Sequence, residues 1–372
     1  MLMWMLIFAG MFLAMLAGII YLISRVYRTE LAKTISKGNK HVQRILAFAV
    51  IAICVGICYL GLGMINTAIV VVHALLVWIV IDLIAWIIKK KSSKTMKYDW
   101  VMLAGILILG VYFGWGWHQA HHVVRTAYEV NTDKKVKNLK VVQITDSHVG
   151  ATFDGEGFAE EVEKIQKENP DLVVVTGDFV DDDTSREDMV RASEALGTLQ
   201  TTYGVYFVFG NHDKGYNNGA RGYDAEKLIR ELQKNNVTVL QDETVLIGEE
   251  YYLIGRQDRS EENLGGSRAT MEELVEDLEK DKFMIVLDHQ PNDYDAQEKS
   301  KVDLVLSGHT HGGQFWPINY LGEWTGQNDM TYGIRQKGDT TFEVSSGISD
   351  WAIKFKTGCK SEYVVIDIQP NN

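Results

Sequence analysis

Five short motifs in the second half of this 372-residue chain are rich in histidine, aspartate or asparagine. They are TDSH (145–148), GDFVDDD (177–183), GNHD (210–213), DHQP (288–291) and GHTH (308–311). The chain has ten histidines, and all five that follow residue 140 lie in or beside these motifs. Chance scatter would not concentrate the imidazoles in this way, so we expect the motifs to meet at one site.

The residue types in these motifs favour divalent metals. Imidazole, carboxylate and amide oxygen together suit Zn, Mn or Fe, whereas calcium prefers oxygen ligands alone. Residues i and i+2 of an extended segment point to the same side, so Asp146 and His148 can reach one ion. Seven candidates exceed one tetrahedral ion and suit two ions about 3.5–4 Å apart, which can clamp a phosphoryl group. The candidates are Asp146, His148, Asp178, Asn211, His289, His309 and His311.

Each motif directly follows a strand-like apolar run. Sites in α/β sheets form at the carboxyl ends of strands, which is where these motifs would lie. Helix-like amphipathic runs fall around 156–168, 185–200, 223–235 and 269–280. This alternation predicts a layered α/β domain with one mixed sheet or two packed sheets. The strand-like runs are 139–145, 172–177, 205–210, 237–240, 251–255, 283–288, 302–308, 341–346 and 363–368.

Charge divides the chain near residue 140. Residues 1–140 contain sixteen Lys and Arg but only five acids, whereas the remainder contains 44 acids and 21 bases. The acidic half disfavours a nucleic-acid polymer as partner, because such polymers bind through basic surfaces. Only Cys359 of the three cysteines lies in that half, so no disulfide framework can form there.

The basic half contains apolar runs long enough to cross a bilayer, which takes roughly 20 residues. They are residues 2–23, two runs within 45–88 separated by GLGMINT, and 100–117. The sequence therefore predicts four transmembrane helices. We assign residues 1–125 to a membrane domain, 126–138 to a linker and 139–372 to the α/β domain.

Basic connections predict the orientation of these helices. Residues 25–44 and 89–97 are rich in Lys and Arg, and short basic loops stay in the cytoplasm. The N-terminus and the α/β domain would then both lie outside the cytoplasm, in a multi-pass protein of the cell membrane. The residues after the fourth run are also mildly basic, which weakens this orientation. Asp82 and His73 lie within the apolar runs, and we interpret them as solvated near a basic loop and packed neutral, respectively.

The ordered set DxH, GD, GNHD, H and GHTH resembles the calcineurin-like metallophosphoesterase superfamily over roughly residues 140–370. GHTHGGQ and SSGISDWAIKFKTGCKSEYVVIDI resemble its bacterial membrane-associated branch, which includes enzymes that cleave the pyrophosphate of lipid-linked UDP-sugars. The resemblance implies a two-sheet αββα sandwich, two divalent metal ions (Mn, Zn or Fe), and hydrolysis of phosphoric ester or pyrophosphate bonds by a metal-bound hydroxide.

The resemblance also implies a role for each motif residue. One metal would be bound by Asp146, His148 and His311. The other would be bound by Asn211, His289 and His309, with Asp178 bridging the two. His212 would be a charged general acid facing the phosphate, with Asp213 orienting its ring.

Other residues near the motifs leave alternatives open. Arg256 and Asp258 follow a strand, where contacts with substrate or with the ligands could come. The acids at 181–183 could tune the metals, although such acids more often precede a helix. The aromatic stretch 315–324 and Trp351 are more often packing than a lipid groove.

Taken together, these residues predict a membrane-anchored dinuclear-metal phosphoesterase. A lipid-linked phosphate or pyrophosphate is one candidate substrate, because membrane helices would hold the domain beside such lipids. The alternatives are a phosphodiesterase for soluble nucleotides and a non-catalytic metal-dependent binding or signalling module. The motif GNHD disfavours the module, because metal binding alone does not need His212.

Overall fold

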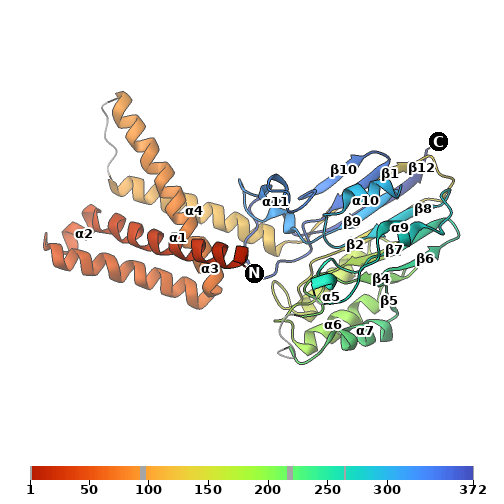
Figure 1. Cartoon of the computed structure of the whole chain (residues 1–372). Coiled ribbons are helices and arrows are strands. Elements are labelled where there is room, and N and C mark those ends of the chain that lie inside the picture. The colour runs from red at the N-terminus through yellow and green to blue at the C-terminus, as the bar shows by residue number, and fades with distance from the viewer. Residues whose placement is uncertain (1, 93–97, 216–220, 264, 372) are drawn as a thin grey trace. The chain divides into compact units, whose positions relative to one another are not determined.

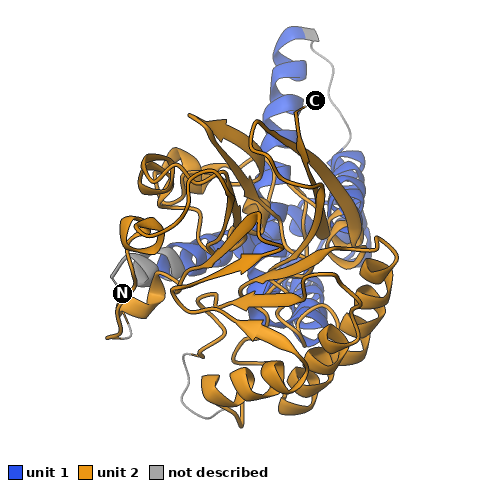
Figure 2. Ribbon diagram, turned by 90° about the vertical axis from the view of Figure 1, so that its right-hand side faces the viewer, with its two compact units in different colours: residues 1–115, 352–354 blue, residues 116–351, 355–372 orange. Residues whose placement is uncertain are grey.

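The computed structural model describes residues 2–92, 98–215, 221–263 and 265–371. The chain forms two compact units, which are coloured separately in Figure 2. Unit 1 comprises Met1–Trp115 with Ala352–Lys354, and unit 2 comprises Gly116–Trp351 with Phe355–Asn372. The metal-ligand candidates all belong to unit 2.

Unit 2 contains two six-stranded mixed sheets (Figure 1). In the first sheet the strand order is β1-β12-β2-β3-β4-β5. Strands β2 to β5 are mutually parallel, whereas β12 runs antiparallel to β2 and parallel to β1. The strands are β1 (Val124–Thr132), β12 (Glu362–Pro370), β2 (Leu139–Ile144), β3 (Leu172–Thr176), β4 (Val205–Val208) and β5 (Val237–Val239).

The second sheet has the order β10-β11-β9-β8-β7-β6. Strands β11, β9, β8 and β7 are parallel, and an antiparallel strand lies at each edge. The strands are β10 (Gly333–Lys337), β11 (Thr340–Val344), β9 (Leu304–Ser307), β8 (Phe283–Leu287), β7 (Tyr251–Gly255) and β6 (Glu243–Ile247). The two sheets confirm the expected α/β fold of paired mixed sheets.

Three apolar clusters hold the layers together. One lies between the sheets and joins residues such as Val141 and Val174 to Ile285 and Leu306. A second packs α5 (Gly155–Gln166), α6 (Arg186–Gly197) and α7 (Ala225–Lys234) against the first sheet. A third packs α9 (Met271–Val275) and α10 (Tyr294–Lys299) against the second sheet. Strands β3 and β8 are fully buried, with sheet or helix on both faces. Burial on both faces requires apolar side chains throughout, which explains their continuous apolar runs.

Three strands were not expected from the sequence. Strands β6 and β10 are edge strands whose side chains are mostly exposed or half-exposed, and the apolar stretch of β6 covers only residues 245–247. Strand β1 covers much of the segment 126–138 that the sequence assigned to a linker. Its polar residues alternate with half-buried ones, and nine residue pairs join it to β12. Residues of β1 therefore form a strand because they pair with the distant strand β12, and not because of their own apolar content.

Within the part of the chain that the structure describes, three helices are long and apolar enough to cross a membrane. The spans are Ala9–Tyr27 in α1 (Leu2–Tyr27), Lys40–Lys91 in α3 (Lys40–Ser92), and α4 (Tyr98–His121). The expected count of four was therefore wrong. No proline or polar run ends the helix at GLGMINT; instead Gly63 alone leaves helical geometry, with φ 79° and ψ 176°.

Other features of unit 1 bear on the predicted topology. Figure 1 shows that α3 changes direction along its length, as the break at Gly63 requires. The basic residues Lys94 and Lys97 lie outside the described residues. Oδ2 of Asp82 lies 2.5 Å from Nη1 of the buried Arg25, while the Asp82 side chain itself stays 42% exposed. The pair therefore joins α1 to α3 as an ion pair among apolar helices.

Candidate metal centre

The carboxyl ends of β2, β3, β4, β8 and β9 bring all five motifs together. Backbone hydrogen bonds join the motif loops directly. The amide of Asp146 donates to Gly177 O at 3.0 Å, and the amide of Gly308 donates to His289 O at 2.9 Å. The second of these bonds lies within the second sheet, and the amide of His309 also donates to the Asp146 carboxylate of the first sheet at 3.0 Å. The two sheets thus share one site at their common edge.

The first group of candidate ligands consists of Asp146, His148 and His311. One ligand atom from each lies within 4.8 Å of the others, and all three residues are buried. Nε2 of His311 lies 3.5 Å from Oδ1 of Asp146. Two imidazoles and one carboxylate suit Zn, Mn or Fe(II).

The second group consists of Asp178, His289 and His309, again with ligand atoms within 4.8 Å of one another. Oδ2 of Asp178 lies 3.1 Å from Nε2 of His289. The same oxygen lies 3.7 Å from Nε2 of His148, which belongs to the first group. A carboxylate between the two groups fits the bridging position that the resemblance implies for Asp178.

Asn211 follows β4 and lies between Gly210 and His212, whose backbone amides both donate hydrogen bonds to site carboxylates. The amide of Gly210 donates to Asp213 at 2.7 Å, and the amide of His212 donates to Oδ1 of Asp178 at 2.8 Å. These contacts place Asn211 beside the second group, so its expected role as a ligand stays a prediction that the geometry supports.

The other ring nitrogen of three ligand histidines faces an acceptor. Nδ1 of His289 lies 2.8 Å from Thr176 O, and Nδ1 of His148 lies 3.3 Å from Asp181. Nδ1 of His311 lies 3.7 Å from Asp350, which is an ion-pair contact beyond hydrogen-bond distance. Acceptors on this side of the rings favour Nε2 as the metal-binding atom. Asp181 therefore supports a ligand, whereas the N-cap of α6 is Ser185. Sequence reasoning gave Asp350 no role, although it lies four residues after the strand-like run 341–346.

Five of the ligand candidates have left-handed backbone conformations. Their φ angles are 52° at Asp146, 36° at His148, 50° at Asp178, 70° at His309 and 46° at His311. Such conformations cost of order 1–3 kcal/mol each and cluster at functional sites. The fold therefore holds these side chains in directions that a relaxed chain would not favour.

Glycines next to the ligands make room for this convergence. A Cβ on Gly308 would lie 2.1 Å from Thr145 Oγ1 and 2.3 Å from Asp146 Oδ2. A Cβ on Gly210 would lie 2.3 Å from Asp178 Oδ1. No real side chain tolerates these distances, so the glycines in GHTH and GNHD are required by close approach rather than by a turn alone.

The electrostatics of the two groups fit the binding of cations. Burial lowers the pKa of His289, but the neighbouring Asp178 carboxylate outweighs burial and raises that pKa well above its ordinary value. Burial and the neighbouring His148 lower the pKa of His311 well below its ordinary value. The buried Nε2 atoms of His148 and His289 have no hydrogen-bond partner. Crowded carboxylates and unbonded imidazole nitrogens are the donor set that divalent metals use.

His212 lies where the two groups meet. Its ring centroid is 5.2 Å from that of His148 and 5.9 Å from that of Trp351. Burial lowers the pKa of His212, although the Asp178 carboxylate acts in the opposite direction. This direction is opposite to the expectation that a neighbouring carboxylate raises the pKa of the ring. The role of His212 as a donor to a substrate oxygen stays a prediction, and an imidazole carries an N–H for it in either protonation state.

Asp213 has a different role from the expected one. Its buried carboxylate accepts hydrogen bonds from four backbone amides, those of Asp178, Phe179, Val180 and Gly210, at 2.7–3.0 Å. Each oxygen accepts two bonds, which uses its lone pairs. Burial and the Asp178 carboxylate raise the pKa of Asp213 to about 7, and the amide donors oppose that rise. Asp213 therefore ties the GD and GNHD loops together rather than orienting the His212 ring.

Arg256 and Asp258 are buried against protein partners rather than open to substrate. Arg256 Nη1 lies 2.9 Å from Asp288 and 2.7 Å from Asp293. Asp258 accepts hydrogen bonds from the Gln290 side chain at 3.0 Å. Since these partners flank His289, we assign both residues to support of the His289 loop, which corrects the expected substrate contact.

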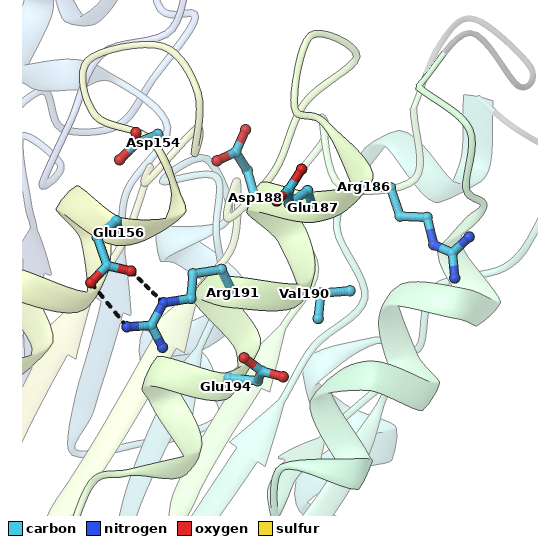
Figure 3. Close-up of a pocket in the computed structure, with 8 residues that line it drawn as sticks. All are labelled: Asp154, Glu156, Arg186, Glu187, Asp188, Val190, Arg191 and Glu194. Carbon is cyan, nitrogen blue, oxygen red and sulfur yellow. Dashed lines mark hydrogen bonds and ion pairs between the residues drawn. The ribbon is translucent and has the colours of Figure 1, made fainter.

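A surface groove of about 760 Å³ lies along α5 and α6 (Figure 3). Its lining is mainly acidic, and the ion pair between Arg191 and Glu156 crosses it at 2.6 Å. None of the eight lining residues is a ligand candidate. Size alone therefore does not identify the functional site.

Comparisons with known proteins identify the family. Residues 139–313 match the family model described as calcineurin-like phosphoesterase. The chain is 30% identical over 234 residues to an uncharacterised metallophosphoesterase of Campylobacter jejuni, covering 63% of this chain and 60% of that protein. It is 30% identical to the metallophosphoesterase YkoQ of Bacillus subtilis, covering 61% and 82% of the two chains.

The name of a bovine relative describes it as a transmembrane protein. The "transmembrane protein with metallophosphoesterase domain" of Bos taurus is 29% identical over 249 residues, covering 63% of this chain and 54% of that protein. The match thus spans about 60% of the length of the Campylobacter relative and about half of the bovine one. The ordered motifs, the paired sheets and these relatives show that the chain belongs to the calcineurin-like metallophosphoesterase family.

Proposed function

We propose that this chain is a membrane-anchored hydrolase that cleaves a phosphoester or pyrophosphate bond with two divalent metal ions, Mn, Zn or Fe. The observation that carries the proposal is the pair of Asp/His groups with Asp178 between them. Membership of the family supports metal-dependent phosphoester chemistry. The substrate, the bond and the membrane anchoring go beyond that membership and form the proposal.

The site residues divide into metal ligands and one hydrogen-bond donor to the substrate. Asp146, His148 and His311 would hold one ion, and Asn211, His289 and His309 the other, with Asp178 shared. Ions in such a pair supply Lewis-acid stabilisation of phosphoryl oxygens and activate water at neutral pH. His212 contributes an N–H directed at the phosphoryl or leaving oxygen, from beside His148. Asp181 and Asp350 keep the ligand rings aligned.

A lipid-linked phosphate or pyrophosphate is the substrate class that we favour. Three apolar helices of spanning length precede the catalytic unit and would hold it where such lipids present their head groups. Purified full-length protein with Mn²⁺ should turn over a lipid pyrophosphate in detergent faster than a soluble nucleotide. A strong preference for the nucleotide would instead support a phosphodiesterase in which the helices only anchor.

The position of the site outside the cytoplasm is also part of the proposal. Basic residues flank the apolar helices at 25–44 and 89–91, which favours a cytoplasmic position for those connections.

A binding or signalling module is the second candidate function. It would need the metal ligands but not His212, whose ring lies beside both groups. The discriminating comparison is between wild type and Asn211→Ala. Hydrolysis by wild type that the variant lacks supports the enzyme. Equal inactivity of both proteins on all phosphoesters, with two metals still bound by wild type, supports the module.

A further inference from the structure

Five large apolar side chains stand exposed on one short segment of unit 2. Together they form what we call the aromatic surface. Its residues expose 64%, 54%, 40%, 50% and 70% of their area and are Trp316, Ile318, Tyr320, Leu321 and Trp324. Single exposed apolar residues are ordinary, but a contiguous patch marks an interaction surface. The expectation that this stretch packs internally was therefore wrong for these five side chains.

The segment is held in a defined conformation, so its exposure is a property of the fold. The amide of Ile318 donates to Phe315 O and that of Leu321 donates to Ile318 O, both at 2.9 Å. These bonds lead into α11 (Leu321–Trp324). The amide of Trp316 donates to Thr357 Oγ1 at 3.2 Å. The backbone is thus fixed while the large side chains point outward.

The aromatic surface shares a supporting segment with the end of α4. The amide of Lys356 donates to Gly116 O at 2.9 Å, and the next residue, Thr357, donates to Gln314 O at 2.9 Å. Residues 355–361 therefore contact both the last turns of α4 and the segment that carries the aromatic surface. All of these residues belong to unit 2. The aromatic surface is therefore linked, through residues 355–361, to the C-terminal end of α4, which is a helix of spanning length.

We propose that the aromatic surface docks unit 2 onto the head-group region of the bilayer. Tryptophan and tyrosine are the residues enriched at membrane–water interfaces, because their rings are apolar with one polar group. Only two residues separate the end of α4 at His121 from the start of β1 at Val124. Such a short connection keeps this side of unit 2 close to any bilayer that α4 crosses.

Docking there would also bring the metal centre to the lipid head groups. His311 lies five residues before Trp316, in the short 3-10 turn His311–Gly313. Gln314, between them, donates to the Asp350 carboxylate that faces His311, at 3.0 Å. The inference rests on the proposed membrane anchoring and deepens the proposed lipid substrate, but docking itself does not require hydrolysis.

Depth-dependent quenching tests the docking directly. Full-length protein with Cys54 and Cys58 replaced by alanine receives one fluorophore, through Ile318→Cys or through Leu246→Cys. Leu246 is the matched control, because it is 50% exposed but lies on β6, at the opposite edge of the sheet from β10. The proteins are reconstituted in phosphatidylcholine vesicles containing lipids spin-labelled near the head group.

Docking predicts about a twofold loss of emission at position 318 and none at 246, since an interfacial side chain lies about 5–10 Å into the boundary region. Equal emission with and without spin-labelled lipid at position 318 overturns the proposal. So does cross-linking between two copies through position 318, which would assign the surface to self-association.

Activity separates this inference from the proposed function. Trp316→Ser with Trp324→Ser should lower hydrolysis of a vesicle-embedded phospholipid substrate about tenfold while hydrolysis of a soluble chromogenic phosphodiester stays unchanged. An equal loss on both substrates overturns the docking role. If wild type hydrolyses neither substrate but position 318 is quenched, the proposed function fails and the docking surface stands.

Discussion

At the scale of single residues, His212 and Asp213 show how neighbours in one motif have separate tasks. The His212 ring lies beside that of the ligand candidate His148, whereas the Asp213 carboxylate is turned toward four backbone amides. The two residues are adjacent after β4, so the sequence did not reveal that their side chains point to different partners. Side-chain direction, which depends on contacts with other loops, decides between them.

Replacing His212 should remove catalysis without removing metal. His212→Gln keeps a hydrogen-bonding side chain but loses the imidazole, so we expect kcat to fall about 10²–10⁴-fold. Bound metal, measured by elemental analysis of the purified protein, should stay at the wild-type level. Loss of metal together with activity would show that His212 is a ligand rather than a donor to substrate.

Replacing Asp213 should instead damage the fold of the site. The NH₂ group of Asp213→Asn would face backbone amides that need an acceptor, and each buried unsatisfied group costs about 1–3 kcal/mol. We expect a lower Tm and weaker metal binding, measured by thermal unfolding with and without added Mn²⁺. His212→Gln is the matched control, with an unchanged Tm expected. A normal Tm and metal content for Asp213→Asn, with lost activity, would restore the ring-orienting role.

At the scale of elements, the loops after β2 and β9 depend on their close approach at Gly308. We expect Gly308→Ala to displace Asp146, because the new Cβ would lie 2.3 Å from Oδ2 of that residue. Metal bound per chain should fall, as measured by elemental analysis. Gly110→Ala in α4 is the matched control, because a Cβ there has nothing within 4 Å. Unaltered metal binding by Gly308→Ala would show that the two loops can separate without loss of the site.

The elements that could be predicted are those whose own residue pattern determines their secondary structure. Buried strands such as β3 and β8 read as unbroken apolar runs, and each ligand motif follows such a run. The edge strand β10 has no such run, and that of β6 covers only residues 245–247. Partners of the ligands, such as Asp350 for His311, depend on loops far apart in the sequence, so spacing could not reveal them.

At the scale of the whole molecule, the number of membrane crossings fixes the relation between the two ends of the chain. Three crossings place the N-terminus and unit 2 on opposite sides, and four place them on the same side. The structure has three helices of spanning length, and α3, at 53 residues with a break at Gly63, is far longer than the roughly 20 needed for one crossing. Alkaline phosphatase, which is active only outside the cytoplasm, should be active when fused after unit 2, as the proposed position of the site requires. An inactive fusion there would contradict that position, and a second fusion at the N-terminus shows whether the number of crossings is odd or even.

The central claim is that two metals bound by this chain hydrolyse a phosphoester, and metal titration of activity tests it most directly. Full-length protein stripped with chelator should not hydrolyse bis(p-nitrophenyl) phosphate. Added Mn²⁺ should restore activity with a break at two equivalents per chain, one for each ligand group. Asp178→Asn, which weakens the ligand between the groups, should abolish that break. Activity that survives chelation, or that saturates at one equivalent, would contradict the account.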